Sequence, residues 1–321
     1  MNTLITGGLG FIGSNLARRL LHDGHQVTLV DSLIPQYGGN LFNIHDIKDR
    51  VRINISDIRD PFSIRELLKG VDVVFNLAGQ TSHADSMTDP FTDLDINAKA
   101  QLSLLEAVRH ICPEAVVVFA STRQIYGRPQ YLPVDESHPI RPVDVNGVNK
   151  VAGEQFHLLY HDVYGIRTTA LRLTNTYGPG MRIKDARQTF LGIWIRNLLK
   201  GDPILVFGDG KQQRDFNYVD DVVDALVRAA KSPACYGKAI NLGHSEVVDL
   251  ASLAQRLVSG EISASWHLVP FPPERQAIDI GDYYSNHNLA GELLGWIPHV
   301  FLQEGLASTI TYYKQHLAPY L

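Results

Sequence analysis

Three glycines near the N-terminus have the spacing of a phosphate-binding loop. Gly7, Gly10 and Gly13 lie in the segment TGGLGFIG, between an apolar run and a helical pattern. Glycine lets the backbone turn tightly and approach a pyrophosphate, and the N-terminus of the following helix offers free N–H groups to the anion. Because glycine is common in turns, this spacing alone is weak evidence for a phosphate site, and the neighbouring segments must support it.

An acidic residue supplies that support. Asp31 ends the next apolar run, 18 residues after Gly13. A carboxylate at this place accepts hydrogen bonds from the ribose hydroxyls of adenosine and repels a 2′-phosphate. Strand, loop, helix and acid together predict a site for NAD rather than NADP. Phe11 and Ile12 of the loop are also assigned to this NAD site.

The composition predicts an ordinary globular protein. The chain has 321 residues, of which 45% are hydrophobic and 20% charged, and its formal net charge is -5. Charges of both signs are spread along it, so neither nucleic acid nor a membrane surface is an expected partner. Cys112 and Cys235 lack metal-ligand spacing, which predicts no metal site and no disulfide framework.

The N-terminus and the apolar runs predict a cytoplasmic location. No segment reaches the roughly 18 apolar residues that a membrane span needs. A strand pattern starts at residue 2, where a signal peptide would have a charged and then an apolar stretch.

Apolar runs alternate with amphipathic patterns over the first half of the chain. This alternation predicts a doubly wound parallel α/β sheet, with ligands at the carboxyl ends of its strands. Strands are expected near 2–6, 26–31, 51–55, 72–77, 115–121 and 167–173, and helices near 11–23, 61–69, 92–110 and 144–164.

The pattern changes after residue 173, where turn-rich segments begin. A strand-like run at Ala239–Leu242 can return to the sheet. We therefore expect a Rossmann domain for NAD over 1–173, with a return segment at about 217–243. Residues 174–216 and 244–321 are expected to form a smaller, interleaved α+β domain for the substrate.

Almost end to end, the chain resembles the extended short-chain dehydrogenase/reductase family, in particular its NAD-dependent nucleotide-sugar epimerases and dehydratases. TGGLGFIG (6–13), DIRD (57–60), NLAGQ (76–80) and STRQIYG (121–127) are similar to the family's glycine, adenine-side, fourth-strand and fifth-strand motifs. The resemblance implies a nucleotide-sugar substrate. It also implies a homodimer through the helices near 92–110 and 144–164.

The resemblance assigns further residues to the cofactor. It implies Asp57 near the adenine amino group, Ile58 against the adenine ring, and Asn97 at the place of the family's helix asparagine. The remaining implied cofactor contacts are Leu77, Ala78, Gly79, Gln80 and Lys150.

Other motifs are similar to the family's substrate-binding segments. In RLTNTYGP (172–179) the asparagine, Asn175, would contact the diphosphate region. By the same likeness Arg214 would hold the diphosphate and Arg275 would clamp it from the far side, since a guanidinium pairs two phosphate oxygens at once. Taken singly, each arginine is more typical of a surface salt bridge than of a ligand contact. The implied substrate contacts are Ser86, Thr122, Asn175, Phe207, Arg214 and Arg275.

One departure from the family pattern concerns the chemistry itself. The family's proton transfer rests on Tyr-x-x-x-Lys, whose spacing puts both side chains on one helix face. Lys150 is present here, but the tyrosine position is Asn146, which cannot act as a base. Lys150 can still hold the nicotinamide ribose; otherwise it is a solvated helix lysine.

A second departure lies in the fifth-strand motif. Related dehydratases carry a pair of acids after the threonine, whereas this chain has Arg123 and Gln124. Neither is a plausible general acid or base, which argues against ordinary 4,6-dehydration. Arg123 could hold a uronate carboxylate or belong to a buried structural ion pair.

Three residues are candidates to replace the missing base. Thr122 occupies the hydroxyl position that assists the tyrosine, but a hydroxyl needs its own base. His83 follows the fourth strand, and histidine suits proton transfer near neutral pH, although a lone loop histidine is more often structural. Lys150 itself, if desolvated, could also act as a base.

These residues leave three hypotheses open. The first is an NAD-dependent nucleotide-sugar epimerase, most simply at C4. The second is an NAD-dependent dehydratase, decarboxylase or dehydrogenase of a nucleotide sugar or uronate that uses Arg123. The third is a catalytically silent protein that binds NAD and a nucleotide sugar. The substrate-side motifs favour a working enzyme, with epimerase first.

Overall fold

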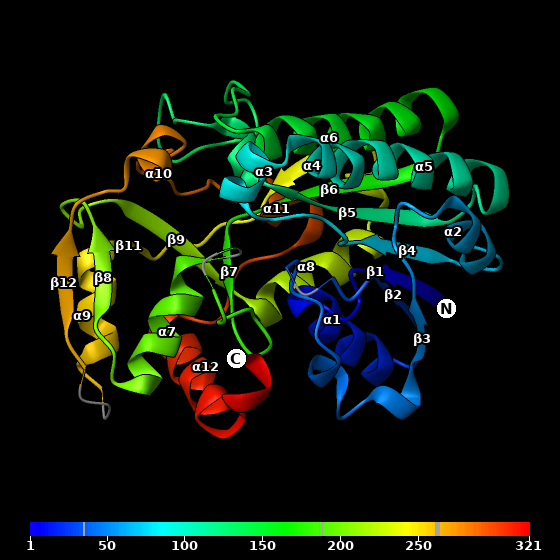
Figure 1. Ribbon diagram of the computed structural model, residues 1–321. Helices are drawn as coiled ribbons and strands as arrows, with labels where there is room; N and C mark the ends of the chain where they lie inside the picture. The colour runs from blue at the N-terminus through cyan, green and yellow to red at the C-terminus, as the bar shows by residue number, and fades with distance from the viewer. Residues whose placement is uncertain (35, 186, 188, 261–263) are drawn as a thin grey trace.

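The computed structural model describes residues 1–34, 36–185, 187, 189–260 and 264–321. Its centre is a parallel seven-stranded sheet with the order β10-β6-β5-β4-β1-β2-β3 (Figure 1). The strands are β1 Asn2–Thr6, β2 Gln26–Asp31, β3 Arg52–Ile55, β4 Val73–Asn76, β5 Val116–Thr122, β6 Arg167–Leu173 and β10 Lys238–Asn241. β10 pairs with β6, so the late strand does return to the sheet.

The strand order reverses beside β1. The chain runs outward from β1 through β2 to β3, then crosses back to β4 on the other side of β1. Connections on either side of this point leave in opposite directions, which opens a crevice outside the carboxyl ends of β1 and β4. The predicted doubly wound sheet is confirmed, and its switch point is where a ligand is expected.

Helices cover both faces of the sheet. One face carries α1 Phe11–His22 and α8 Val219–Lys231, and the other carries α2 Pro61–Leu67, α5 Ala100–Ile111 and α6 Val145–Tyr164 (Figure 1). Along β1, Leu4 is buried in the core with α2 and α5, and Ile5 is buried in the core with α1 and α8. This alternation explains why the strands are apolar on both faces.

The helix predicted near 92–110 is not one continuous α-helix. The structure has α3 His83–Thr88, α4 Pro90–Leu94, a π-helical turn at Asp95–Lys99 and then α5. The helical span was right, but the π turn shifts the register of the side chains that follow. It carries Asn97, in keeping with the frequent occurrence of π turns at functional sites.

A second lobe contains smaller sheets and the remaining helices. The sheets have the orders β11-β9-β7 and β12-β8. The elements are β7 Asn175–Tyr177, α7 Phe190–Lys200, β8 Ile204–Phe207, β9 Gln213–Tyr218, β11 Val247–Asp249, α9 Leu250–Val258, β12 Trp266–Val269, α10 Pro273–Ala277, α11 Asn288–Leu294 and α12 Leu302–His316. α11 packs against α8 and β10, so part of the chain after residue 244 lies on the larger sheet.

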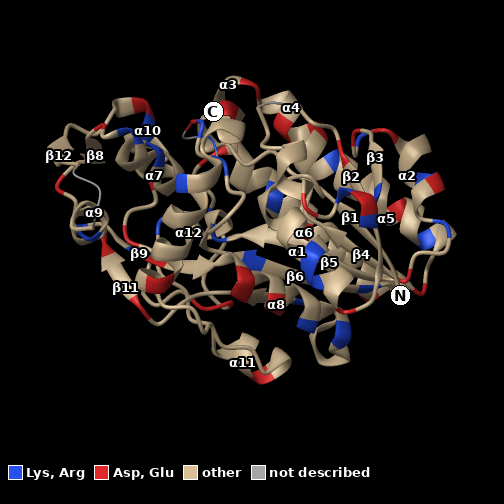
Figure 2. Cartoon of the chain, turned by 90° about the horizontal axis from the view of Figure 1, so that it is seen from below, with Lys and Arg blue, Asp and Glu red and all other residues tan. Residues whose placement is uncertain are grey.

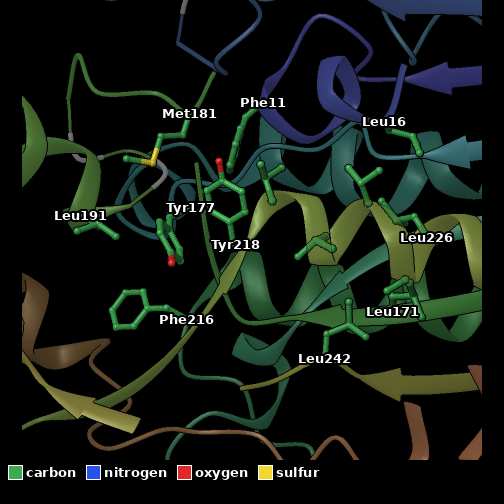
Figure 3. Packing of buried hydrophobic residues seen from close by; sticks show 14 of the residues in the cluster. Phe11, Leu16, Leu171, Tyr177, Met181, Leu191, Phe216, Tyr218, Leu226 and Leu242 are labelled. Atoms are coloured by element: carbon green, nitrogen blue, oxygen red, sulfur yellow. The ribbon is translucent and has the colours of Figure 1, made fainter. Parts of the chain in front are cut away.

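Apolar packing joins the two lobes. Phe11 of α1 belongs to the same buried cluster as Tyr177, Met181, Phe216 and Tyr218 from the segments that enter the second lobe (Figure 3). The rings of Tyr177 and Tyr218 meet edge to face, with centroids 5.6 Å apart. A close-packed core of this kind fixes the position of the second lobe beside the glycine loop.

Charged residues are distributed over both lobes (Figure 2). Among the residues that the structure describes, no helix is both long and apolar enough to span a membrane.

Candidate active site

The glycine loop leaves room for a phosphate at the end of β1. Gly7 has a φ of +68°, a left-handed conformation that favours glycine. A Cβ added to Gly13 would lie 2.3 Å from the carbonyl oxygen of Gly7, so only glycine fits there. Gly10 is the N-cap of α1, and no side chain among the residues described accepts from the N–H groups at this end of the helix. The first N–H groups of α1 are therefore open to a pyrophosphate.

Asp31 lies at the carboxyl end of β2 and lines the same cleft. The backbone N–H groups of Leu33 and Leu9 donate to its two carboxylate oxygens at 2.9 and 3.1 Å. Burial raises the pKa of the Asp31 carboxyl, against the effect of these donors. The donors fix the carboxylate and leave each oxygen a second lone pair for a ribose hydroxyl.

Replacing Asp31 by Ala is expected to weaken NAD binding and to narrow the preference for NAD over NADP. Hydrogen bonds to a charged group contribute about 1.5–3 kcal/mol, or roughly 10–100-fold in affinity. Calorimetric titration with both cofactors measures this, with Asp49→Ala on an exposed turn as the control. An unchanged ratio of the two affinities would remove Asp31 from cofactor selection.

The residues predicted to contact the adenine lie in the same cleft. Asp57 and Ile58 both line it, and Ile58 is 7% exposed. The Arg59 guanidinium, 2.7 Å from Asp57, holds the pKa of that carboxyl below its ordinary value. An ionised acceptor beside a small apolar surface can take the amino group and ring face of an adenine.

The cleft beyond β4, where the resemblance predicts the nicotinamide, gathers polar atoms around a glycine. Residues 77–79 follow β4 and line the cleft. A Cβ added to Gly79 would lie 2.9 Å from Lys150 Nζ and 3.0 Å from Asn97 Oδ1, so these two atoms converge there. Gln80 is buried behind the lining, where its carbonyl oxygen accepts from Asn97 Nδ2 at 2.9 Å.

Lys150 is a buried amine and not a solvated helix lysine. It is 7% exposed, its Nζ donates to the carbonyl oxygen of Ala120 at 3.3 Å, and it lies over the ring of Phe119. Burial lowers the pKa of Lys150 to about 8, opposed by the charge of Asp93. An amine so placed can bind ribose hydroxyls and stabilise negative charge on a substrate oxygen.

The side chain of Asn146 is held in one orientation. Its Nδ2 donates to the carbonyl oxygen of Gln80 at 2.8 Å and to Asp93 Oδ2 at 2.9 Å. Both partners are acceptors only, so they fix which end of the amide is nitrogen. Asn149 Nδ2 donates to the other oxygen of Asp93 at 2.8 Å. Asn146 lines the cleft, and Oδ1 is the atom of its amide left to accept from a ligand.

A histidine and an aspartate form a pair at the cleft. His83 Nδ1 lies 3.0 Å from Asp144 Oδ2, and the His83 side chain is 38% exposed. Burial opposes ionisation of Asp144, but contacts with His83, Gly147 and Gln124 outweigh it and hold the pKa of the carboxyl below its ordinary value. The contact has the distance of an ion pair without the angles of a hydrogen bond, since His83 Nδ1 has no hydrogen-bond partner among the residues described.

The residues at the end of β5 connect this pair to the predicted catalytic residues of the cleft. Thr122 lines the cleft, and its Oγ1 accepts from the backbone N–H of Gln124 at 3.2 Å. Gln124 Nε2 donates to Asp144 at 2.8 Å. Arg123 also lines the cleft and donates to Asn175 Oδ1 at 3.0 Å, and no ion pair joins it to a carboxylate among the residues described.

Among the residues described, four predicted substrate contacts do not line the cleft: Ser86, Phe207, Arg214 and Arg275. Ser86 is buried and accepts from the backbone of Asn146 at 3.1 Å. Arg214 donates to the carbonyl oxygen of Gly281. The Arg275 guanidinium lies 5.4 Å from the centroid of the Phe207 ring. Their contacts with a substrate stay predictions.

Sequence reasoning missed two acids at this site. Asp144 is the N-cap of α6 and accepts from the backbone of Gly147 at 2.6 Å. A cap signal could have located it, but its contact with His83 depends on tertiary packing. Asp93 gives no local signal, because its role arises only where α4 packs against α6.

The comparisons with known proteins agree with this geometry. A family model described as "NAD dependent epimerase/dehydratase family" matches residues 3–243. The chain belongs to this family. NAD is therefore the cofactor of the cleft, and the glycine loop, Asp31 and the Lys150 amine fit it.

Relatives of several activities cover nearly the whole chain. It is 34% identical to the UDP-glucose 4-epimerase of Mycolicibacterium smegmatis, over 98% of this chain and 99% of that protein. It is 33% identical to UDP-glucuronic acid decarboxylase 1 of Xenopus tropicalis, over 98% and 72%. The solved UDP-glucuronic acid 4-epimerase of Bacillus cereus, in complex with UDP-glucuronic acid and NAD, has a TM-score of 0.87, at 29% identity over 98% and 100%. These relatives agree, at the level of the family, with an NAD-dependent enzyme of the epimerase type that acts on nucleotide sugars.

Proposed function

We propose that this protein is an NAD-dependent epimerase of a nucleotide sugar, most simply a UDP-sugar that reacts at C4. One observation carries the proposal: His83, paired with Asp144, lines the cleft that Thr122 and Lys150 also line. The pair supplies a proton acceptor in a site where the expected tyrosine is Asn146. The match to the 4-epimerase of M. smegmatis supports the reaction type.

The residues of the cleft have separate roles in epimerisation. NAD, held by the glycine loop, Asp31 and Lys150, would supply reversible hydride transfer at C4 of the sugar. His83 Nε2 accepts the proton of the C4 hydroxyl and gives it back when the alcohol forms again, so the net change is an isomerisation. Lys150 stabilises negative charge on that oxygen, and Thr122 donates to it.

Asn146 and Asp93 have a positioning role in this scheme. Asp93 and the carbonyl oxygen of Gln80 hold the amide nitrogen of Asn146, so its oxygen can only accept. A neighbouring sugar hydroxyl is the donor that fits it. The proton transfer that tyrosine performs in relatives is thus separated here from the orientation of the sugar.

Arg123 favours a second candidate, an NAD-dependent decarboxylase or dehydrogenase of a nucleotide uronate. The relative from X. tropicalis is named as a decarboxylase of this kind. Ordinary 4,6-dehydration is disfavoured, because Gln124 donates to Asp144 and leaves no acid or base at that place.

Proton NMR tests the reaction type. The NAD-loaded protein would be incubated with UDP-glucose, UDP-glucuronate and UDP-N-acetylglucosamine, without added reductant. We expect the signals of the C4 epimer to appear with at least one of them and to reach a constant ratio. No epimer from any sugar would contradict the proposal, and loss of the carboxyl carbon from UDP-glucuronate would replace it by the second candidate.

The exposed apolar residues of α4 and α6 support a homodimer through these helices. Phe91 and Leu94 on α4, and Val148, Leu159 and Val163 on α6, are 44–77% exposed. Apolar surface gathered in this way is typical of a protein interface. The pattern supports the predicted dimer.

Replacing Leu159 by Glu is expected to shift the protein from dimer to monomer. Burial of an unpaired carboxylate, duplicated by two-fold symmetry, should raise the dimer dissociation constant at least about 10-fold. Sedimentation equilibrium measures this, with Ile297→Glu, 55% exposed outside these helices, as the control. A variant as dimeric as the native chain would place the interface elsewhere.

A further inference from the structure

Arg123 presents hydrogen-bond donors that the protein does not use. Its Nη2 donates to Asn175 Oδ1 at 3.0 Å. Its Nη1 is buried and has no hydrogen-bond partner among the residues described. The guanidinium carbon lies over the Tyr283 ring, 5.1 Å from its centroid. A buried donor left unpaired costs free energy unless a ligand satisfies it.

The buried acid Asp215 does not satisfy the free donor of Arg123. Asp215 attracts it through space, but the Asp215 oxygens accept from Thr174 Oγ1 at 2.5 Å and from the Ser285 backbone at 3.1 Å. No hydrogen bond runs from Arg123 to Asp215 in the described part of the chain. Burial lowers the pKa of the Arg123 guanidinium, as expected for a cation without an adjacent counter-ion.

Arg172 shows how this protein pairs a structural arginine. Its Nη2 and Nε lie 2.6 and 3.0 Å from the two oxygens of Glu154, and both side chains are nearly inaccessible. The contacts with Glu154 outweigh burial and raise the pKa of Arg172. Arg123 has no such partner in the described part of the chain, so a buried structural ion pair does not account for it there.

A second guanidinium adds to the positive charge at this corner. Arg214 is 5% exposed, and its nearest carboxylate oxygen, on Asp279, is 3.8 Å away. Burial and the charge of Arg123 lower the pKa of Arg214 to about 10. Asp215, Asp279 and Asp282 attract these cations through space, but Arg123 Nη1 still has no hydrogen-bond partner among the residues described, which favours an anionic ligand beside it.

We propose that Arg123 binds a carboxylate on the sugar of the substrate, so that the protein acts on nucleoside diphosphate uronates in preference to neutral sugars. The inference rests on the proposed function, because it takes the cleft beside NAD to hold the sugar. Arg123 directly follows Thr122, and both line the cleft with Lys150. Its free N–H groups lie in one plane, which matches a carboxylate.

Binding of matched ligands tests this without requiring turnover. NAD-loaded native protein and the Arg123→Gln variant would be titrated calorimetrically with UDP, UDP-glucose and UDP-glucuronate. The two sugars differ only at C6, a hydroxymethyl group against a carboxylate. We expect native protein to bind UDP-glucuronate at least about 10-fold more tightly than UDP-glucose, the range of a charge-assisted hydrogen bond. The variant should lose this preference and keep its affinity for UDP.

The remaining outcomes overturn the proposal. These are equal or tighter binding of UDP-glucose, no binding of UDP-glucuronate, or a preference that survives in Arg123→Gln. Equal loss of UDP binding in the variant would assign Arg123 to the diphosphate instead. Arg50→Gln, an exposed arginine with no cleft contact, is the control and should behave as native. A uronate preference without epimerisation would support this inference and contradict the proposed reaction, so the two failures are distinguishable.

Discussion

Replacing His83 by Gln is expected to lower kcat by about 10²–10⁴-fold, the usual contribution of a general base. Glutamine fills a similar volume and can donate a hydrogen bond to Asp144, but it cannot accept a proton. KM should change far less, because substrate binding rests on other residues. Steady-state epimerisation, followed by NMR or a coupled assay, gives both constants.

Two further variants make this result specific. Asp144→Asn keeps an acceptor for the Gly147 N–H at the start of α6 and removes the charge beside His83, so kcat should fall while the fold is kept. His22→Gln is the control, since His22 lies 3.4 Å from Asp23 in an exposed pair outside the cleft. If His83→Gln retained the native kcat, the buried Lys150 amine would become the leading candidate for the base.

Replacing Glu154 by Gln is expected to lower the free energy of unfolding by about 3–5 kcal/mol, because it leaves the buried Arg172 cation unpaired. Glu154 also accepts from Ser121 Oγ at 2.6 Å. The pair therefore connects α6, which carries Lys150, to the ends of β5 and β6. Urea unfolding followed by circular dichroism measures the change as a lower midpoint at constant slope.

An exposed ion pair in the same protein provides the control for Glu154. Glu114 pairs with Arg167, and their side chains are 84% and 43% exposed. Glu114→Gln should lower stability by less than about 1 kcal/mol, because water solvates the arginine that remains. Similar losses in the two variants would contradict the structural role given to the buried pair.

The sequence predicted the cofactor half of this protein because its signals are local. Gly7 to Gly13 and Asp31 lie within one strand–helix–strand unit, where spacing translates directly into position. The apolar strands also show their burial in a few consecutive residues. The structure confirms the doubly wound sheet and adds the order of its strands, with β10 beside β6.

The catalytic half depends on contacts between distant segments. His83 could be named as a candidate, but Asp144 lies 61 residues away and is joined to it only by packing of α3 on α6. Asp93 and Asn146 are likewise 53 residues apart. The π turn before α5 has no periodicity that single-sequence reasoning detects, so a continuous helix was the natural expectation.

Two arginines show the same dependence on contacts between distant segments. Arg123 and Arg172 occur in equally motif-like segments, and the sequence does not say which one has an ionic partner. The structure separates them, since Glu154 lies against Arg172 and Arg123 is left with an unused donor. Which arginine serves the fold and which is available to a ligand is therefore a tertiary property.

The central claim is that the cleft oxidises a nucleotide sugar without the usual tyrosine. Stopped-flow absorbance tests it most directly, by mixing the NAD-loaded native protein with UDP-glucuronate and with UDP-glucose at the absorption band of reduced nicotinamide. We expect a transient rise in absorbance in the native protein and a rise slowed at least about 100-fold in His83→Gln. Sugar that binds to the native protein without any rise would contradict the account and show a silent binding protein.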